Sequence, residues 1–324
     1  LFLTFKKLIR LLDSAVGGEP FFSRLASGKI DDKTVVFAGD TGRVNVAMGR
    51  RGKTPSKFGC RQEVDFNFFQ AHLWREMKGK SEHIAPAVVW REIQTFIKGH
   101  RKVADSREGF LSREDYMELV GMKMNWAVRG SRDDLYDLFL SYESCKKAIN
   151  GFDRMDVAFD VLRRLQQHDY KGPPIHHLYV DEVQDLAQIE AVLMMRVLPN
   201  PQAIVFVGDT CQTVSSETDF RFKDLRSCVK EIFYPTSSPE VVKELWSLLV
   251  NYRSHDGIVQ ASNHIVSLLE ELFPMTIDKL PPAMGQNAGP PPECLNFDEL
   301  SRLLCELDSK RSSRSTCLLG ANQL

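Results

Sequence analysis

The chain lacks several features that would place it in a membrane or in a secretory pathway. It has no run of about 18 uninterrupted apolar residues, which is the length that a membrane-spanning helix requires. Its first residues contain no signal-peptide apolar core and no small-residue cleavage site. An initiator methionine is also missing, so we expect the sequence to be a fragment. These absences predict a protein that does not associate with membranes.

Cysteine is present but without any disulfide or zinc pattern. The 7 cysteines are scattered, and neither a Cys-x-x-Cys pair nor a histidine pair at zinc-finger spacing occurs. We therefore expect reduced thiols and a location in the nucleus or cytoplasm. Charge of one sign is not in excess either, because 42 Lys and Arg residues balance 43 Asp and Glu residues. Any binding of nucleic acid must then use local basic patches.

An apolar run that ends in acidic residues is the most informative stretch that the chain does contain. Residues 178–185 read Leu-Tyr-Val-Asp-Glu-Val-Gln-Asp. Ligands collect at the carboxyl ends of strands in a parallel sheet. An Asp at that edge can hold Mg²⁺, and the Glu after it can orient or deprotonate a water molecule. For these residues alone, an ordinary strand that runs into an acidic turn is the alternative interpretation.

A second apolar run has the same layout. Residues 203–207 read Ala-Ile-Val-Phe-Val and lead into Gly-Asp-Thr-Cys-Gln at 208–212. Between the two runs, residues 186–198 carry apolar side chains at helical spacing. This order predicts a strand, a helix and a second strand that pairs with the first in parallel. Further along, Asn-Tyr-Arg-Ser at 251–254 places an arginine before another amphipathic segment.

In order and spacing, these three segments resemble motifs II, III and IV of the UvrD/Rep-like superfamily 1 helicases. The segments are Asp-Glu-Val-Gln-Asp at 181–185, Gly-Asp-Thr-Cys-Gln at 208–212 and Asn-Tyr-Arg-Ser at 251–254. Asp-Phe-Arg-Phe at 219–222 is similar, in finer detail, to the UvrD-like domain of TPR and ankyrin repeat-containing proteins. The specific resemblance covers roughly residues 130–280, since any one motif alone is common.

The resemblance implies a role for each motif residue. Asp181 would bind Mg²⁺, and Glu182 would activate the attacking water. Gln212 would sense the γ-phosphate of ATP, while Asp209 would help to hold that loop. Arg253 would reach the γ-phosphate from a neighbouring lobe. Opposing charge around the phosphate oxygens is what phosphoryl transfer requires. Without the family context, a turn glutamine and a surface ion-pair arginine remain the alternatives.

A nucleic-acid contact near the first residues rests on two positions only. The resemblance would place Thr4 and Phe5 in a segment that touches the backbone of single-stranded nucleic acid, DNA rather than RNA. A plain junction of strand and helix is the alternative for this segment.

Residues 47–54 read Ala-Met-Gly-Arg-Arg-Gly-Lys-Thr and satisfy a relaxed phosphate-loop pattern. A true phosphate loop needs a buried strand before it and a helix after it. A poor strand precedes this segment, and Pro55 and Gly59 follow it closely. In the family that the chain resembles, the phosphate loop precedes the segment that corresponds to Thr4 and Phe5, whereas residues 47–54 follow it. We therefore interpret it as a basic surface loop, and we expect the isolated chain, including its Lys53→Ala variant, to hydrolyse ATP hardly at all.

Together these observations predict an α/β fold, a RecA-like P-loop NTPase parallel sheet with a helical insertion and the start of a second lobe. Residues 1–63 would form part of the first lobe with a loop insertion, and 64–170 a helical insertion. Residues 171–248 would carry motifs II and III, and 249–324 would begin the second lobe.

The predicted function is that of an ATP-dependent helicase or translocase that uses ATP, Mg²⁺ and single-stranded nucleic acid, as part of a larger multidomain protein. The alternative is a catalytically retired module that senses nucleotides or acts as a scaffold. It is favoured by residues 213–216, Thr-Val-Ser-Ser, which lack the aromatic side chain that stacks on a base in the family.

Overall fold

The structure is a computed structural model that describes residues 2–26, 62–77, 84–122, 132–212, 220–236, 245–273 and 277–293, together with 295, 296, 299 and 302. The Gly-Lys-Thr loop at 47–54 and the segment 213–216 lie outside these residues. The chain divides into two compact units. Unit 1 consists of Leu1–Leu245 and Leu272–Lys279, and unit 2 consists of Trp246–Glu271 and Leu280–Leu324.

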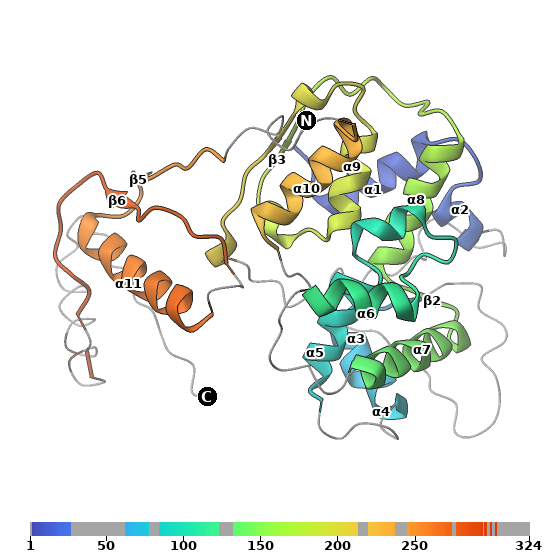
Figure 1. The fold of residues 1–324 in the computed structure, drawn as a ribbon, viewed down its shortest axis with the longest axis horizontal. Coiled ribbons are helices and arrows are strands. Elements are labelled where there is room, and N and C mark those ends of the chain that lie inside the picture. Colours follow the sequence, from blue (N-terminus) through green and yellow to red (C-terminus); the bar gives the residue numbers. More distant parts are fainter. Residues whose placement is uncertain are drawn as a thin grey trace. The chain divides into compact units, whose positions relative to one another are not determined.

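Unit 1 is built mainly of helices (Figure 1). Its α-helices are α1 (Phe5–Ala15), α2 (Phe21–Ala26), α3 (Phe66–Phe68), α4 (Trp74–Met77), α5 (Pro86–Arg91), α6 (Arg113–Met122), α7 (Arg132–Ala148), α8 (Arg154–Gln167), α9 (Gln188–Arg196) and α10 (Phe222–Phe233). Two π-helical segments join or continue them, Phe69–Leu73 and Glu92–Ile97. Short 3₁₀ turns occupy Arg101–Asp105, Val183–Asp185, Pro201–Ala203 and Thr210–Gln212.

Two parallel strands of unit 1 carry the acidic turn and the second motif. Strand β3 (Leu178–Val180) pairs with β4 (Ile204–Phe206), so that Val180 lies opposite Phe206. The ladder continues beyond the strands, because the N–H of Val207 donates to the carbonyl of Val180 at 2.8 Å. The predicted strand, helix and parallel strand are confirmed, with α9 as the connecting helix.

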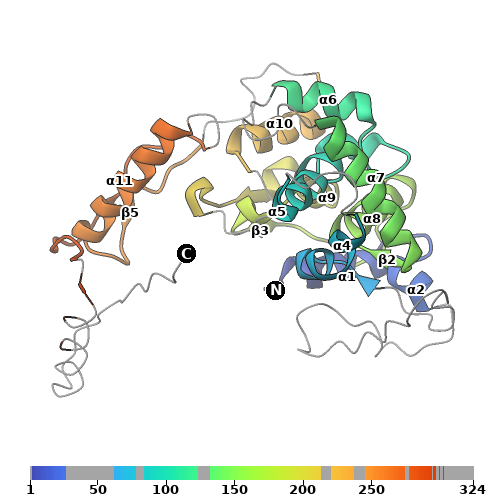
Figure 2. The ribbon, with the colours of Figure 1, turned by 90° about the horizontal axis from the view of Figure 1, so that it is seen from below.

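Helix α9 holds this strand pair to the rest of unit 1. Its residues Ile189–Met195 are all buried, so the helix is covered on every side. It packs against both α8 and α10, which flank it in Figures 1 and 2. An apolar cluster that includes Val180, Met195 and Phe222 joins β3 to α9 and α10. The carboxyl ends of β3 and β4 are therefore fixed to a helical core.

The predicted continuous parallel sheet is only partly present. The described residues form three two-stranded parallel sheets: β3 with β4, β1 (Gln62–Glu63) with β2 (Gly151–Phe152), and β5 (Val250–Asn251) with β6 (Met284–Gly285). Strands of a parallel sheet are usually buried on both faces, but Tyr179 is 74% exposed and its partner Val205 is 45% exposed. Successive side chains alternate between faces, and helices among the described residues cover one face of this pair.

Unit 2 has a small α/β arrangement of its own. Helix α11 (Asp256–Leu272) follows β5 directly, and the carboxylate of Asp256 accepts a hydrogen bond from the N–H of Gly285 in β6 at 2.9 Å. Gly257 has to be glycine, because a Cβ atom there would lie 2.0 Å from the carbonyl oxygen of Pro290. Among the residues that the structure describes, no helix of either unit combines the length and apolar character that a membrane crossing requires.

Candidate functional site

The acidic turn begins where β3 ends and has an unusual backbone conformation. Glu182 lies in the left-handed region, with φ 53° and ψ 42°. A non-glycine residue rarely adopts this conformation, which costs about 1–2 kcal/mol. The N–H of Glu182 donates to Oδ1 of Asp181 at 3.0 Å, and a 3₁₀ turn at Val183–Asp185 follows. The strained residue therefore coincides with the residue to which the sequence assigns the catalytic carboxylate.

A buried glutamine connects this turn to the loop after β4. Gln184, which is 1% exposed, donates from Nε2 to the carboxylate of Glu182 at 2.5 Å. Its Oε1 accepts the N–H of Asp209 at 3.1 Å. The two motifs are thus joined through one side chain at the carboxyl ends of β3 and β4.

Asp209 organises the loop that carries Gln212. Its carboxylate accepts the N–H of Cys211 at 2.9 Å and the side-chain amide of Gln212 at 2.7 Å. Its carbonyl accepts the N–H of Gln212 at 3.1 Å. A continuous chain of hydrogen bonds consequently runs from Glu182 through Gln184 and Asp209 to Gln212.

The carboxylates of this turn are open to solvent and suited to a hard cation. Asp181 and Glu182 are both exposed. Within the described part of the chain, neither forms an ion pair with a lysine or arginine. Exposed carboxylate oxygens without a competing ammonium group are the ligands that Mg²⁺ prefers. The donor set therefore fits Mg²⁺, which Asp181 would hold.

A second acidic cluster lies in the helical part of unit 1 and could be mistaken for a metal site. Oxygen atoms of Glu143, Asp153 and Asp156 lie within 4.8 Å of one another. The ammonium groups of Lys98 and Lys146 occupy this cluster, each contacting all three carboxylates at 2.5–3.2 Å. The cations of the protein therefore take the place that a metal ion would need.

The pKa values of the cluster follow from this pairing. Burial alone would raise the pKa of Asp153, but Lys146 and Lys98 hold it well below its ordinary value. Burial would likewise lower the pKa of Lys98, whereas Asp153, Asp156 and Glu143 together raise it well above its ordinary value. Asp153 is thus kept ionised by two lysines of the protein itself, which indicates a structural role for the cluster.

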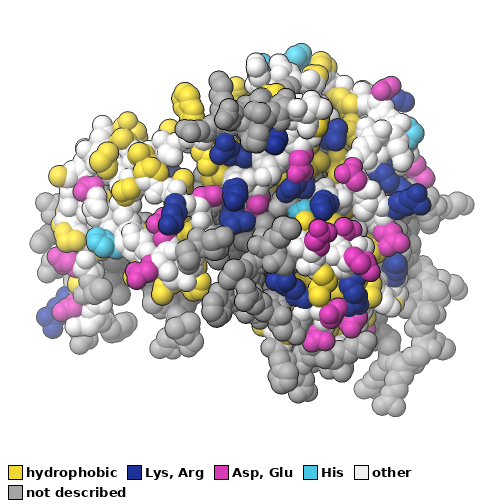
Figure 3. All heavy atoms as spheres, viewed as in Figure 1, with side chains coloured by type: hydrophobic (Ala, Val, Ile, Leu, Met, Phe, Trp, Pro, Cys, Tyr) yellow, Lys and Arg dark blue, Asp and Glu magenta, His cyan; other side chains and the backbone are white. Residues whose placement is uncertain are grey.

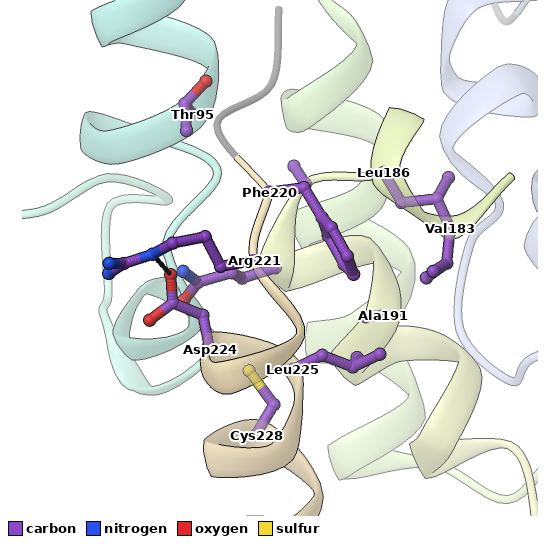
Figure 4. A pocket seen from close by; sticks show the side chains of 11 residues that line it. Thr95, Val183, Leu186, Ala191, Phe220, Arg221, Asp224, Leu225 and Cys228 are labelled. Carbon is purple, nitrogen blue, oxygen red and sulfur yellow. Dashed lines mark hydrogen bonds and ion pairs between the residues drawn. The ribbon is translucent and has the colours of Figure 1, made fainter. Parts of the chain in front are cut away.

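A small cavity is lined by residues of the acidic turn, α9 and α10. Val183, Leu186, Phe220, Leu225 and Cys228 contribute most of its apolar wall (Figure 4). Its volume of about 20 Å³ leaves room for roughly one water molecule. It therefore does not accept a nucleotide, and the solvent-exposed edge remains the candidate site.

The structure gives Thr4 and Phe5 local structural contacts. The hydroxyl of Thr4 caps α1 by accepting the N–H of Lys7 at 3.4 Å. The guanidinium of Arg154 lies 5.1 Å from the ring centre of Phe5. Arg154 also forms an ion pair with buried Glu190 of α9. These contacts explain the two residues without a ligand, and their contact with nucleic acid stays a prediction.

Arg253 belongs to unit 2. It is exposed, and its N–H donates to the side-chain oxygen of Asn251 at 2.9 Å, as does the N–H of Ser254 at 2.8 Å. Asn251 therefore shapes the turn that presents Arg253 to solvent.

Two residues of the candidate site were not predicted. Gln184 and Gly208 both stood inside the motifs, but neither had an assigned role. A glutamine between apolar and acidic neighbours is the only hint in the sequence, because the close approach of the two loops is a tertiary contact. Side chains of opposite charge are interleaved on the face shown in Figure 3, which fits the balanced composition.

Comparison with known proteins agrees with the family resemblance over the part of the chain that carries residues 181–185 and 208–212. Residues 62–221 match the model of the UvrD/REP helicase N-terminal domain. The human TPR and ankyrin repeat-containing protein 1 is 30% identical over 349 residues, in an alignment that covers 100% of this chain. The chain spans 12% of the length of that curated relative. Residues 62–221 therefore belong to the UvrD/REP helicase N-terminal domain family.

Proposed function

We propose that the protein is an ATP-dependent helicase or translocase that moves on single-stranded nucleic acid, DNA rather than RNA. Residues 171–248 would contain the ATP-binding part of a RecA-like lobe, and unit 2 would contribute the start of the second lobe. The hydrogen-bonded connection between the acidic turn and the Asp209–Gln212 loop at the ends of two parallel strands carries this proposal. Family membership of residues 62–221 supports it.

The residues of the site divide the work of phosphoryl transfer. Mg²⁺, when bound, would neutralise charge on the phosphate oxygens. Asp181 would hold the ion through its exposed carboxylate, and Glu182 would orient a water molecule and accept its proton. Gln212, fixed by Asp209, would donate a hydrogen bond to the γ-phosphate. Arg253 would add positive charge from unit 2 as the transition state develops.

A single substitution of the proposed base tests this assignment. Glu182→Gln in the full-length protein should lower the turnover of Mg-ATP by about 10²- to 10⁴-fold, the contribution typical of a general base. Nucleotide binding should be retained, because the amide keeps the size of the side chain. Glu118→Gln, which changes an exposed carboxylate of α6, is the matched control and should leave turnover unchanged. Equal turnover in wild type and Glu182→Gln would refute the proposed role of Glu182.

A catalytically retired scaffold module is the second candidate. It is favoured by the structural contacts of Thr4 and Phe5, which need no nucleic acid. It is also favoured by Thr-Val-Ser-Ser at 213–216, which offers no aromatic ring for stacking on a base. Turnover of ATP that rises when single-stranded DNA is added would exclude this candidate. Binding of Mg-ATP without any turnover would favour it.

A further inference from the structure

We propose that Gln184 is a positioning residue that makes the Glu182 turn and the Asp209–Gln212 loop move as one unit. Its action is exerted through Glu182 and Asp209. The proposal rests on the proposed function for its kinetic consequence, whereas the mechanical connection can be measured without any activity.

Both ends of the Gln184 amide form hydrogen bonds, and the side chain is buried. The side chain is 1% exposed, with Nε2 directed to the Glu182 carboxylate at 2.5 Å and Oε1 to the N–H of Asp209 at 3.1 Å. Buried hydrogen bonds of this kind are strong, and one of them involves a charged acceptor. An amide is the side-chain group that supplies a donor and an acceptor in this pair of directions.

The loop after β4 is shaped to admit this amide. A Cβ atom at Gly208 would lie 2.5 Å from Oε1 of Gln184 and 2.9 Å from Cγ1 of Val183. Glycine at this position is therefore required by close approach of the two loops. Any larger residue would push the glutamine away from the N–H of Asp209.

The connection matters because Glu182 has a strained backbone and an exposed side chain. Glu182 lies between β3 and the turn at Val183–Asp185, with φ at 53°, so regular secondary structure does not fix the direction of its exposed side chain. The hydrogen bond from Gln184 supplies that direction. The same glutamine accepts a hydrogen bond from Asp209, whose carboxylate in turn accepts one from the side chain of Gln212. A shift at the γ-phosphate-sensing loop would thus be transmitted to the water-activating carboxylate.

The kinetic test uses Gln184→Met, which keeps the volume of the side chain and removes both hydrogen bonds. We expect kcat for Mg-ATP hydrolysis by the full-length protein to fall about 10- to 100-fold, the size of losing a hydrogen bond to a charged group. KM for ATP should stay within about twofold, because the two hydrogen bonds of the buried Gln184 amide are made to Glu182 and Asp209. Gln188→Met, four positions along the chain and without contact to Glu182, is the matched control and should leave kcat unchanged.

Two further variants refine the result. Gln184→Glu keeps an oxygen for the N–H of Asp209 but presents a second carboxylate to Glu182, so it should lower kcat at least as far as Gln184→Met. Gly208→Ala retains Gln184 but displaces it, and it should reproduce the loss of kcat. Gly208 does not have a positive φ, so strain of the backbone does not explain a defect there.

Hydrogen exchange separates failure of this inference from failure of the proposed function. The amide of Asp209 should exchange about tenfold faster in Gln184→Met than in wild type, and the amides of α9 should be unaffected. Unchanged exchange at Asp209 would overturn the connection. Faster exchange with unchanged kcat would overturn the positioning role. If the wild-type protein has no ATP turnover, the proposed function and the positioning role fail together, and exchange at Asp209 still decides the mechanical connection.

Discussion

Unit 1 contains two groups of three carboxylates that differ in almost every physical respect. In one, Glu143, Asp153 and Asp156 lie in the helical core against Lys98 and Lys146. In the other, Asp181, Glu182 and Asp185 follow a strand, and the first two are exposed. The first group shares its charge with two lysines, whereas Asp181 and Glu182 of the second group face solvent. Residue type alone therefore does not distinguish a structural ion cluster from a candidate catalytic site.

The difference lies in where each group gets its compensating charge. A buried carboxylate has to be paired within the protein, since an isolated charge in the interior is very costly. An exposed carboxylate is compensated by water, and it can exchange that water for a cation or a substrate. The helical cluster connects Lys98, after α5, with α7 and the start of α8. In the acidic turn, Val183 and Gln184 pack inside the protein, whereas the carboxylates of Asp181 and Glu182 stay open to solvent.

Removal of one cation from the buried cluster should have the largest effect on stability. In Lys98→Met, Lys146 would be left with three carboxylates, and we expect a loss of about 3–5 kcal/mol of unfolding free energy. Urea denaturation measures this change. Glu182→Gln is the counterpart in the exposed turn and should shift the unfolding free energy by less than about 0.5 kcal/mol. Similar losses in both variants would remove the distinction between the two groups.

The same cluster predicts how stability depends on pH. The pKa of Asp153 is lowered in the folded state, so its contribution is complete above the unfolded value of about 3.9 and is lost as pH falls below it. The pKa of Lys98 is raised, so its contribution is complete below about 10.4 and is lost as pH rises further. We expect a plateau between these limits and losses on the order of 2 kcal/mol on each side.

Asp153→Asn tests the acidic side of this curve. Its unfolding free energy should be lower than that of wild type at neutral pH, and it should depend less on pH between about 2 and 4, because the group with the lowered pKa is gone. Thermal melting across this range is the measurement. An acid dependence as steep as that of wild type would show that other carboxylates are responsible.

Local features of the fold were predictable from the sequence, whereas contacts between distant residues were not. The strand at 178–180, α9 and the strand at 204–206 follow from apolar runs and helical spacing. The exposed face of Tyr179 and Val205 was not anticipated, because a run of apolar residues does not show which face is covered. Lys98 and Asp153 lie 55 positions apart in the sequence, so no local pattern connects them.

The candidate site shows the same limit. Asp181, Glu182, Asp209 and Gln212 were assigned from the motifs, and the structure brings their two segments together through Gln184. The left-handed conformation of Glu182 depends on how the turn meets the loop after β4. A glutamate rarely adopts a positive φ, so the residue type does not predict this conformation. Tertiary packing therefore overrides the local preference at this position.

The strained backbone of Glu182 predicts a smaller effect on stability, in which glycine is more favourable than alanine at this position. Glycine adopts a positive φ without strain, so Glu182→Gly should be more stable than Glu182→Ala by about 0.5–1 kcal/mol. Differential scanning calorimetry compares the two variants. Glu118, in the regular helix α6, provides the control. There the alanine variant should be more stable than the glycine variant by about 1 kcal/mol. The same order of stability at both positions would contradict the strained conformation.

The weakest expected effect is binding of a metal ion without nucleotide. Mn²⁺ is a paramagnetic substitute for Mg²⁺ and should broaden NMR signals of residues 181–182 at millimolar concentration, because their carboxylates are exposed. Signals of Asp153 and Asp156 should stay sharp, since a metal ion would first have to displace two ammonium groups. In Lys98→Met one ammonium is gone, so broadening there would show that lysine, rather than geometry, keeps the buried cluster free of metal. Broadening of the Asp153 and Asp156 signals in wild type would instead mean that the metal ion readily displaces the lysines. The two groups of carboxylates would then differ only in their accessibility to solvent.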